Sequence, residues 1–197
     1  MPNAAEQLMT LEEFLAWERE QPARYEYAGG VATMMTGGSA AHATIAMNFL
    51  IALRRTLRDT GCRPFGSDMK VIANGTVRYP DVSITCRPIG DKDDTVPEPV
   101  LVVEVISPST EREDRGRKKF DCFATPSIRQ YAIVEQEERR VDLYTRGAEG
   151  WVNEIVTGEE TLNLSGVGVM LPLAALYEDT ELDLTRRQAG GSAAAAS

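Results

Sequence analysis

The chain has 197 residues, of which 43% are hydrophobic and 26% charged, so it suits one globular domain and excludes a fibrous or largely disordered protein. Its 21 basic and 30 acidic residues give a formal net charge of −9, which excludes nucleic-acid binding by bulk electrostatic attraction. A partner that carries phosphates would need a local basic patch or bound cations.

The first third of the chain predicts a helix, a hairpin and a longer helix. Thr10 and Glu13 form a capping-box pattern ahead of a short helix. Residues 24–35 predict two strands that turn at Gly29-Gly30. Ser39 is placed to cap a longer helix, in which apolar residues recur at helical spacing and whose other face is basic: His42, Ile45, Ala46, Phe49 and Leu53, against Arg54, Arg55 and Arg58.

Strand patterns follow. The runs 69–72 and 77–86 flank Asn74-Gly75, a strong hairpin signal. Pro80 in the second run predicts an edge position or a bulge, because proline cannot donate to the ladder. Residues 100–106 predict a buried central strand, since they are nearly all aliphatic.

The second half predicts a helix from 107–110 to about Ala124, then strands at 130–135, 140–146 and 151–156, and a short helix at 172–177. The fold class is therefore a mixed α/β sheet with helices packed on it. We expect one domain over residues 8–184 and a disordered tail over 185–197.

Cysteine usage and the start of the chain predict a soluble, cytoplasmic protein with reduced thiols. Cys62, Cys86 and Cys122 are too few and too scattered for a disulfide framework. Residues 1–6 do not have the pattern of a signal peptide, and the longest apolar run is too short to span a bilayer.

Glu104 is the most unusual residue, because a lone carboxylate in an aliphatic strand costs several kcal/mol unless it is paired, protonated or bound to a metal. A buried ion pair with an arginine is the structural alternative. Asp81 follows a proline where a strand starts, although Pro-Asp is also a common turn pair. If their strands are neighbours, both carboxylates lie at one end of the sheet, as Mg²⁺ or Mn²⁺ ligands would.

A basic run follows the strand that carries Glu104. Residues 111–119 contain five basic and three acidic side chains. Such a run is usually a solvated helix face, but here its basic groups can lean over the carboxylates.

These residues together resemble the bacterial Uma2-like family of restriction endonucleases, a domain of unknown function within the PD-(D/E)xK nuclease superfamily. The resemblance rests on Tyr79-Pro80-Asp81-Val82, on the segment 102–110, and on Asp114 and Lys118, and it covers residues 9–180 in one register. It implies a restriction-endonuclease-like mixed β-sheet core flanked by helices, with extra β-hairpins.

The resemblance also implies roles for individual residues. Asp81 and Glu104 would be metal ligands, with the Val105 carbonyl as a third. Ile106 stands where the superfamily has its lysine, so that role passes to Lys118, with Lys119 as the alternative.

Two further positions match the family. Glu26 corresponds to an acidic position near the site, and His42 to a recurring histidine whose role the sequence leaves unassigned. The implied catalytic set is therefore Asp81, Glu104, Lys118 and Glu26.

The implied function is an Mg²⁺- or Mn²⁺-dependent endonuclease that hydrolyses DNA phosphodiester bonds, as a homodimer, with weak and metal-dependent DNA contact. The alternative is a non-catalytic binding or regulatory module that retains the nuclease-like fold. The net charge of −9 and the lack of a separate DNA-reading motif favour that alternative.

Overall fold

The computed structural model describes residues 8–106 and 114–183. The helices are α1 (Leu11–Glu18), α2 (Ala40–Thr56), the π-helical turn η1 (Asp114–Lys118), α4 (Lys119–Ala124) and α5 (Leu173–Leu176). The strands are β1 (Tyr25–Ala28), β2 (Val31–Met34), β3 (Arg63–Gly66), β4 (Val71–Ala73), β5 (Thr76–Arg78), β6 (Val82–Thr85), β7 (Pro99–Ile106), β8 (Gln130–Glu135), β9 (Arg140–Gly147), β10 (Gly150–Thr157), β11 (Thr161–Leu164) and β12 (Val169–Pro172).

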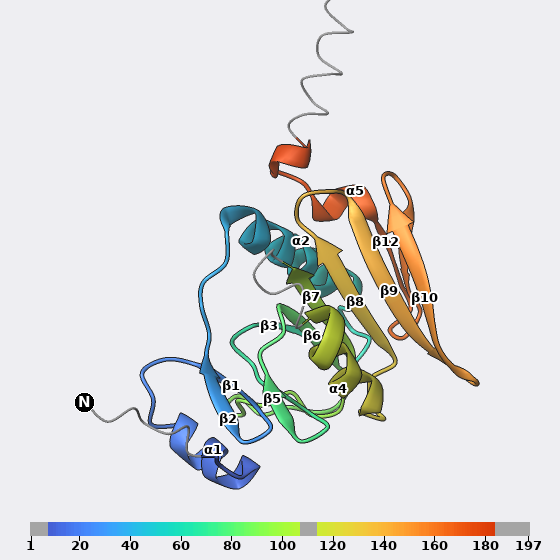
Figure 1. Ribbon diagram of the computed structural model, residues 1–197. Helices are drawn as coiled ribbons and strands as arrows, with labels where there is room; N and C mark the ends of the chain where they lie inside the picture. Colours follow the sequence, from blue (N-terminus) through green and yellow to red (C-terminus); the bar gives the residue numbers. More distant parts are fainter. Residues whose placement is uncertain (1–7, 107–113, 184–197) are drawn as a thin grey trace, which may run out of the picture.

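In this part of the chain a six-stranded sheet has the order β10-β9-β8-β7-β6-β3, and a four-stranded sheet has the order β2-β1-β5-β4. β11 and β12 form a separate hairpin. Strands β7 and β8 run parallel, and their other neighbours in the large sheet run antiparallel. The small sheet and α1 lie to one side of the molecule, away from β8–β10 (Figure 1). The predicted mixed sheet flanked by helices, with extra hairpins, is confirmed.

Local signals account for the first elements. The Thr10 side chain accepts from the Glu13 amide, and the Glu13 carboxylate accepts from the Thr10 amide, so the capping box is complete. Ser39 caps α2 by accepting from the His42 amide. Asn74 and Gly75 both have positive φ angles, which the tight turn between β4 and β5 requires.

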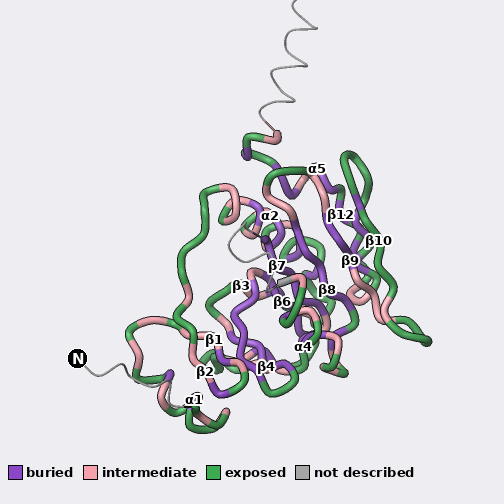
Figure 2. Tube along the Cα trace, viewed as in Figure 1, coloured by how far each residue is buried: buried purple, intermediate pink, exposed green. Residues whose placement is uncertain are grey.

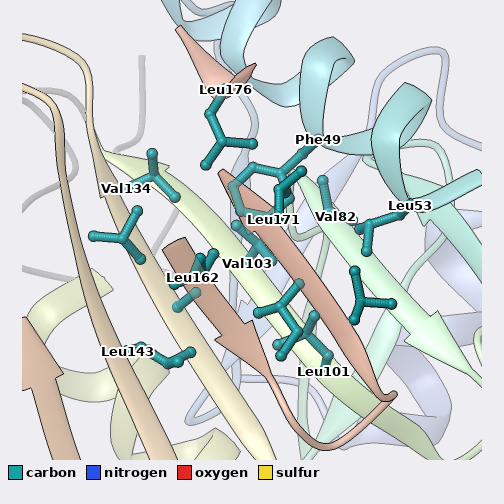
Figure 3. Close-up of a cluster of buried hydrophobic side chains, with 14 of the residues drawn as sticks. Phe49, Leu53, Val82, Leu101, Val103, Val134, Leu143, Leu162, Leu171 and Leu176 are labelled. Carbon is teal, nitrogen blue, oxygen red and sulfur yellow. The ribbon is translucent and has the colours of Figure 1, made fainter. Parts of the chain in front are cut away.

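The central strand β7 is buried because both of its faces are covered. On one face, Leu101 and Val103 pack with Phe49 and Leu53 of α2 (Figure 3). On the other, Val102 and Ile106 pack with Cys122 of α4 and residues of β8. The middle of the sheet is accordingly buried, whereas the outer strand β10 is largely exposed (Figure 2). Burial on both faces explains why β7 is an almost unbroken aliphatic run.

The chain around Pro80 differs from the prediction. The run 77–86 is not one strand with an edge proline or a bulge at residue 80, because β5 ends at Arg78 and β6 begins at Val82, and the two belong to different sheets. Pro80 lacks an amide hydrogen and so interrupts the ladder completely. The three residues 79–81 carry the chain from the small sheet to the large one.

The expectation of reduced thiols is wrong for two cysteines. Cys62 and Cys86 form a disulfide that closes a separation of 24 residues. They flank the paired positions Arg63 and Thr85 of β3 and β6, so the sheet brings them together although the sequence scatters them. Cys122 is buried with a free thiol.

The later elements follow the prediction, except that the β11–β12 hairpin and β3 had not been anticipated. The helix after β7 ends at Ala124 as expected, although its predicted start at 107–110 lies outside the described residues, as does the predicted tail. No helix among the described residues is long and apolar enough to cross a membrane.

Candidate active site

Asp81 and Glu104 lie at the same end of neighbouring strands. Val82 of β6 pairs with Val103 of β7, so Asp81 enters β6 beside the position of Glu104. The Asp81 Oδ2 atom accepts a hydrogen bond of 2.7 Å from the Val105 amide. The Asp81 side chain therefore accepts a hydrogen bond from a β7 amide just before β6 begins at Val82.

His42 is the second partner of Asp81. Its Nε2 atom lies 3.1 Å from Asp81 Oδ2, and both side chains are largely buried. The imidazole stands in the first turn of α2, whose start Ser39 fixes by capping. The structure therefore places the histidine of unassigned role against a proposed metal ligand, where it helps to fix the carboxylate.

Glu104 is paired, and its partner is a lysine. Lys118 Nζ lies 3.7 Å from Glu104 Oε1 and 3.1 Å from Glu26 Oε1. Only 6% of the Glu104 side chain is exposed, so a charge of opposite sign is what its burial requires. Since Glu26 comes from β1, Lys118 joins the two sheets.

The ionic chain continues beyond the predicted residues. The buried Arg78 lies 2.9 Å from the second oxygen of Glu26 and 3.4 Å from Asp121 Oδ2. Thr76 and Asn74 also donate to the Asp121 carboxylate. Charges of alternating sign thus run from Asp121 through Arg78, Glu26 and Lys118 to Glu104.

Sequence reasoning missed Arg78 and Asp121. The signal that could have found Arg78 is the one that singled out Glu104, because Arg78 is also a charged residue in a short strand in which every residue is buried. Asp121 carries no comparable local signal, since it lies on the last helix before β8, 43 residues from Arg78.

Lys118 and Lys119 have different surroundings. Whereas Lys118 faces the two glutamates, the Lys119 ammonium lies 4.8 Å from the centre of the Tyr144 ring, in a cation–π contact. Only the first is therefore placed to act with Glu104.

The buried Cys122 thiol is not a nucleophile at neutral pH. Burial raises the pKa of this thiol, and the negative charges of Glu104 and Asp121 raise it further. The thiol stays protonated and packs as an apolar group against β7.

The donor atoms at the end of β7 suit a hard divalent cation with few protein ligands. No three His, Cys, Asp or Glu side chains converge as a metal site within residues 8–106 and 114–183. Mg²⁺, however, is commonly held by one or two carboxylates together with water. Because the N–H and C=O of one strand residue face the same edge, the Val105 carbonyl shares the edge on which its amide meets Asp81. Two carboxylates and one carbonyl are therefore available.

Comparison with known proteins identifies relatives over nearly the whole chain. Residues 11–174 match a family model, Uma2, described as "Putative restriction endonuclease". Uncharacterized protein slr1290 of Synechocystis sp. (strain ATCC 27184 / PCC 6803 / Kazusa) is 34% identical over 181 residues, which cover 89% of this chain and 95% of the relative. Uncharacterized protein sll1609 of the same organism is 27% identical over 166 residues, 81% of this chain and 93% of the relative.

A solved structure shares the fold. The crystal structure of a "putative nuclease belonging to DUF820" from Anabaena variabilis ATCC 29413 superposes with a TM-score of 0.71 at 16% identity, over 86% of this chain and 97% of the other. The resemblance that the sequence carries is thus confirmed at the level of family and fold.

Proposed function

The chain belongs to the Uma2 family, and on that premise we propose that it is a divalent-metal-dependent endonuclease that hydrolyses phosphodiester bonds in DNA. The observation that carries the proposal is the position of Lys118, between the carboxylates of Glu26 and Glu104 and at the end of the sheet where Asp81 also lies. A cation beside acidic ligands is the combination that phosphodiester hydrolysis uses.

In this proposal Asp81, Glu104 and the Val105 carbonyl hold Mg²⁺ or Mn²⁺. Such an ion, when bound, lowers the pKa of a coordinated water and offsets the charge of the phosphodiester. Lys118 orients the attacking water or stabilises the negative charge that develops on phosphorus. Glu26 holds the Lys118 ammonium in place, and His42 holds the Asp81 carboxylate.

The Cys62–Cys86 disulfide counts against the cytoplasmic location that reduced thiols would favour, because disulfides are rare in cytosolic proteins. A homodimer belongs to the same proposal. Cutting both strands of a duplex requires two sites, which a two-fold dimer supplies.

A second candidate is a binding or regulatory module without catalysis. Two observations favour it: Lys118 already contacts two carboxylates, and the described residues form no cluster of three metal-binding side chains. Calorimetry separates the candidates, because an endonuclease binds Mg²⁺ or Mn²⁺ with an affinity that Glu104→Gln removes, whereas the module binds neither ion.

The test of the endonuclease is nicking of supercoiled plasmid DNA with Mg²⁺ or Mn²⁺. We expect Asp81→Asn and Lys118→Ala to lower the rate at least about 100-fold, in line with the loss of one group that stabilises transition-state charge. Lys119→Ala is the matched control for charge and position, and Glu154→Gln is the exposed carboxylate control. Thermal melting verifies that each variant folds.

Two results would overturn the endonuclease. One is equal nicking by the wild type, Asp81→Asn and Lys118→Ala. The other is the absence of metal-dependent cleavage by the wild type on plasmid, linear duplex and single-stranded DNA with both ions.

A further inference from the structure

The six-stranded sheet carries arginines at the end opposite Glu104. Arg63 begins β3 and pairs with Thr85, and Thr85 pairs with the start of β7. Gln130, which follows Arg129, begins β8 and pairs with the end of β9. The register therefore gathers these strand ends, and the arginines on or beside them are Arg63, Arg87, Arg129 and Arg146. The last turn of α2 and the residues just after it add Arg54 and Arg58.

Three neighbouring cavities lie at this end of the sheet. The first, of about 370 Å³, is lined by Arg54, Arg58 and Arg63. The second, also about 370 Å³, includes Arg87 and Arg129, and it adjoins the first across the disulfide, since each contains one of its cysteines. The third, of about 380 Å³, shares Arg129 and adds Arg146. Asp59 and Glu98 are the carboxylates among the linings of these cavities.

Two of these arginines have structural partners. Arg87 pairs with Glu98, and Arg146 donates to the backbone carbonyls of Ile128, Phe123 and Thr125. Such contacts hold loops in place and leave less of the guanidinium for a ligand.

The other four are exposed and, among the described residues, have no carboxylate within 4.0 Å: Arg54, Arg58, Arg63 and Arg129. The helix dipole accounts for basic residues at the end of α2, but not for Arg63 or Arg129, which lie on or beside strands. The Arg63 guanidinium lies 5.2 Å from the centre of the Phe65 ring, in a cation–π contact. In a chain of net charge −9, these four exposed guanidinium groups without a carboxylate partner form a local positive region that attracts anions.

We propose that this arginine surface, Arg54, Arg58, Arg63 and Arg129, binds the phosphodiester backbone of a nucleic acid. Guanidinium groups bind phosphate oxygens in a bidentate manner, which suits several arginines along one surface. From β3, which carries Arg63, to β8, which Arg129 precedes, the sheet spans three inter-strand spacings of about 4.8 Å, roughly 14 Å in all, close to the rise of four base steps at about 3.4 Å. The segment bound here is distinct from one at the carboxylates, so the inference goes beyond the proposed cleavage.

The test is fluorescence anisotropy with a labelled DNA duplex of about 20 base pairs, in EDTA, across a series of KCl concentrations. Each lost phosphate contact lowers the slope of log K against log salt by about 0.9. We expect the triple variant Arg58→Gln/Arg63→Gln/Arg129→Gln to lower this slope by about 2 to 3 and the affinity at low salt at least tenfold. The control triple variant, Arg19→Gln/Arg24→Gln/Lys92→Gln, removes the same charge elsewhere and should change the affinity less than about threefold.

Three results would overturn the arginine surface: equal losses in both triple variants, no wild-type binding at low salt, or displacement of the duplex by polyglutamate as effectively as by unlabelled DNA. The last result would assign the surface to an acidic protein. Because EDTA removes the ion on which cleavage would depend, arginine-dependent binding by a wild type that does not nick DNA would overturn the endonuclease alone.

Discussion

The two ends of the six-stranded sheet hold charge in opposite ways. At the end with Asp81 and Glu104, charged side chains are buried and paired, and each fixes the position of the next. At the opposite end, the guanidinium groups of Arg63 and Arg129 are exposed and have no carboxylate partner among the described residues, although Arg87 beside them pairs with Glu98. Buried pairs give positional accuracy, which chemistry at a single phosphorus needs. Exposed, unpaired charges give attraction to a polyanion, which tolerates loose geometry.

The largest expected effect is on the free energy of unfolding, which should depend much more on a buried arginine than on an exposed one. Arg78→Met leaves Glu26 and Asp121 without their shared cation, so we expect the free energy of unfolding to fall by about 3–5 kcal/mol in urea denaturation. Arg63→Gln at the exposed end should change it by no more than about 0.5 kcal/mol. Arg78→Met/Asp121→Asn should recover part of the loss. Equal effects of Arg78→Met and Arg63→Gln would contradict the contrast between the ends.

The disulfide stabilises the arginine end. Reduction of the Cys62–Cys86 bond, which closes a separation of 24 residues, should lower the free energy of unfolding by about 3.5 kcal/mol on the chain-entropy model. Cys62→Ser/Cys86→Ser should match the reduced wild type and lose no further stability with reductant. Thiol titration of the denatured chain provides the check on the bond itself, with Cys122 alone reacting before reduction. Reaction of all three cysteines in the unreduced chain would contradict it.

His42 tests how far the buried end depends on one orienting contact. His42→Gln removes the imidazole from Asp81, and we expect the Mg²⁺ concentration for half-maximal nicking to rise about tenfold, as for other groups that orient a metal ligand. The rate at saturating Mg²⁺ should stay within a few-fold of the wild type. A lower saturated rate with an unchanged Mg²⁺ requirement would show that His42 does not act through Asp81.

The smallest expected effect concerns the ionisation of the Tyr79 phenol, two residues before Asp81. Burial raises the pKa of the Tyr79 phenol, and its hydrogen bond to Glu18 and the Glu18 charge raise it further. Because the folded state holds this proton more tightly, the stability it contributes is present below the ordinary value of 10.0 and is lost as the pH rises above it. Ultraviolet titration should show Tyr79 ionising at a higher pH than free tyrosine, and Tyr79→Phe should remove one late-titrating group. Ionisation of every tyrosine near pH 10 would contradict this.

The parts of the fold that were predicted correctly are those that depend on residues close together in the sequence. The cap at Thr10, the Asn74-Gly75 turn and the aliphatic run of β7 each depend on neighbouring residues, and each formed as predicted. β3 was missed because Pro64 and Gly66 are unfavourable in a strand, and it owes its place to pairing with β6 and to the disulfide.

The candidate site likewise has residues that stand out in the sequence and residues that only the fold brings together. Asp81, Glu104 and Lys118 were found through an odd carboxylate, a basic run and a family resemblance, all of them visible in the sequence. Arg78 and Asp121 meet only because β5 and α4 come together in the fold, and no spacing in the sequence reports that contact. The arginine surface was only partly visible: the sequence shows the basic helix face with Arg54 and Arg58, but only the register of the sheet brings Arg63 and Arg129 to one end.

The interruption at Pro80 has a mechanical consequence. Only residues 79–81 connect β5 to β6, so the connection between the two sheets is short. Asp81 is its last residue. Glu26 belongs to the small sheet and Glu104 to the large one, and Lys118 contacts both. A shear of one sheet against the other would therefore displace Asp81 and stretch the contacts of Lys118 together. The geometry of the candidate site therefore depends on how the two sheets are held against each other.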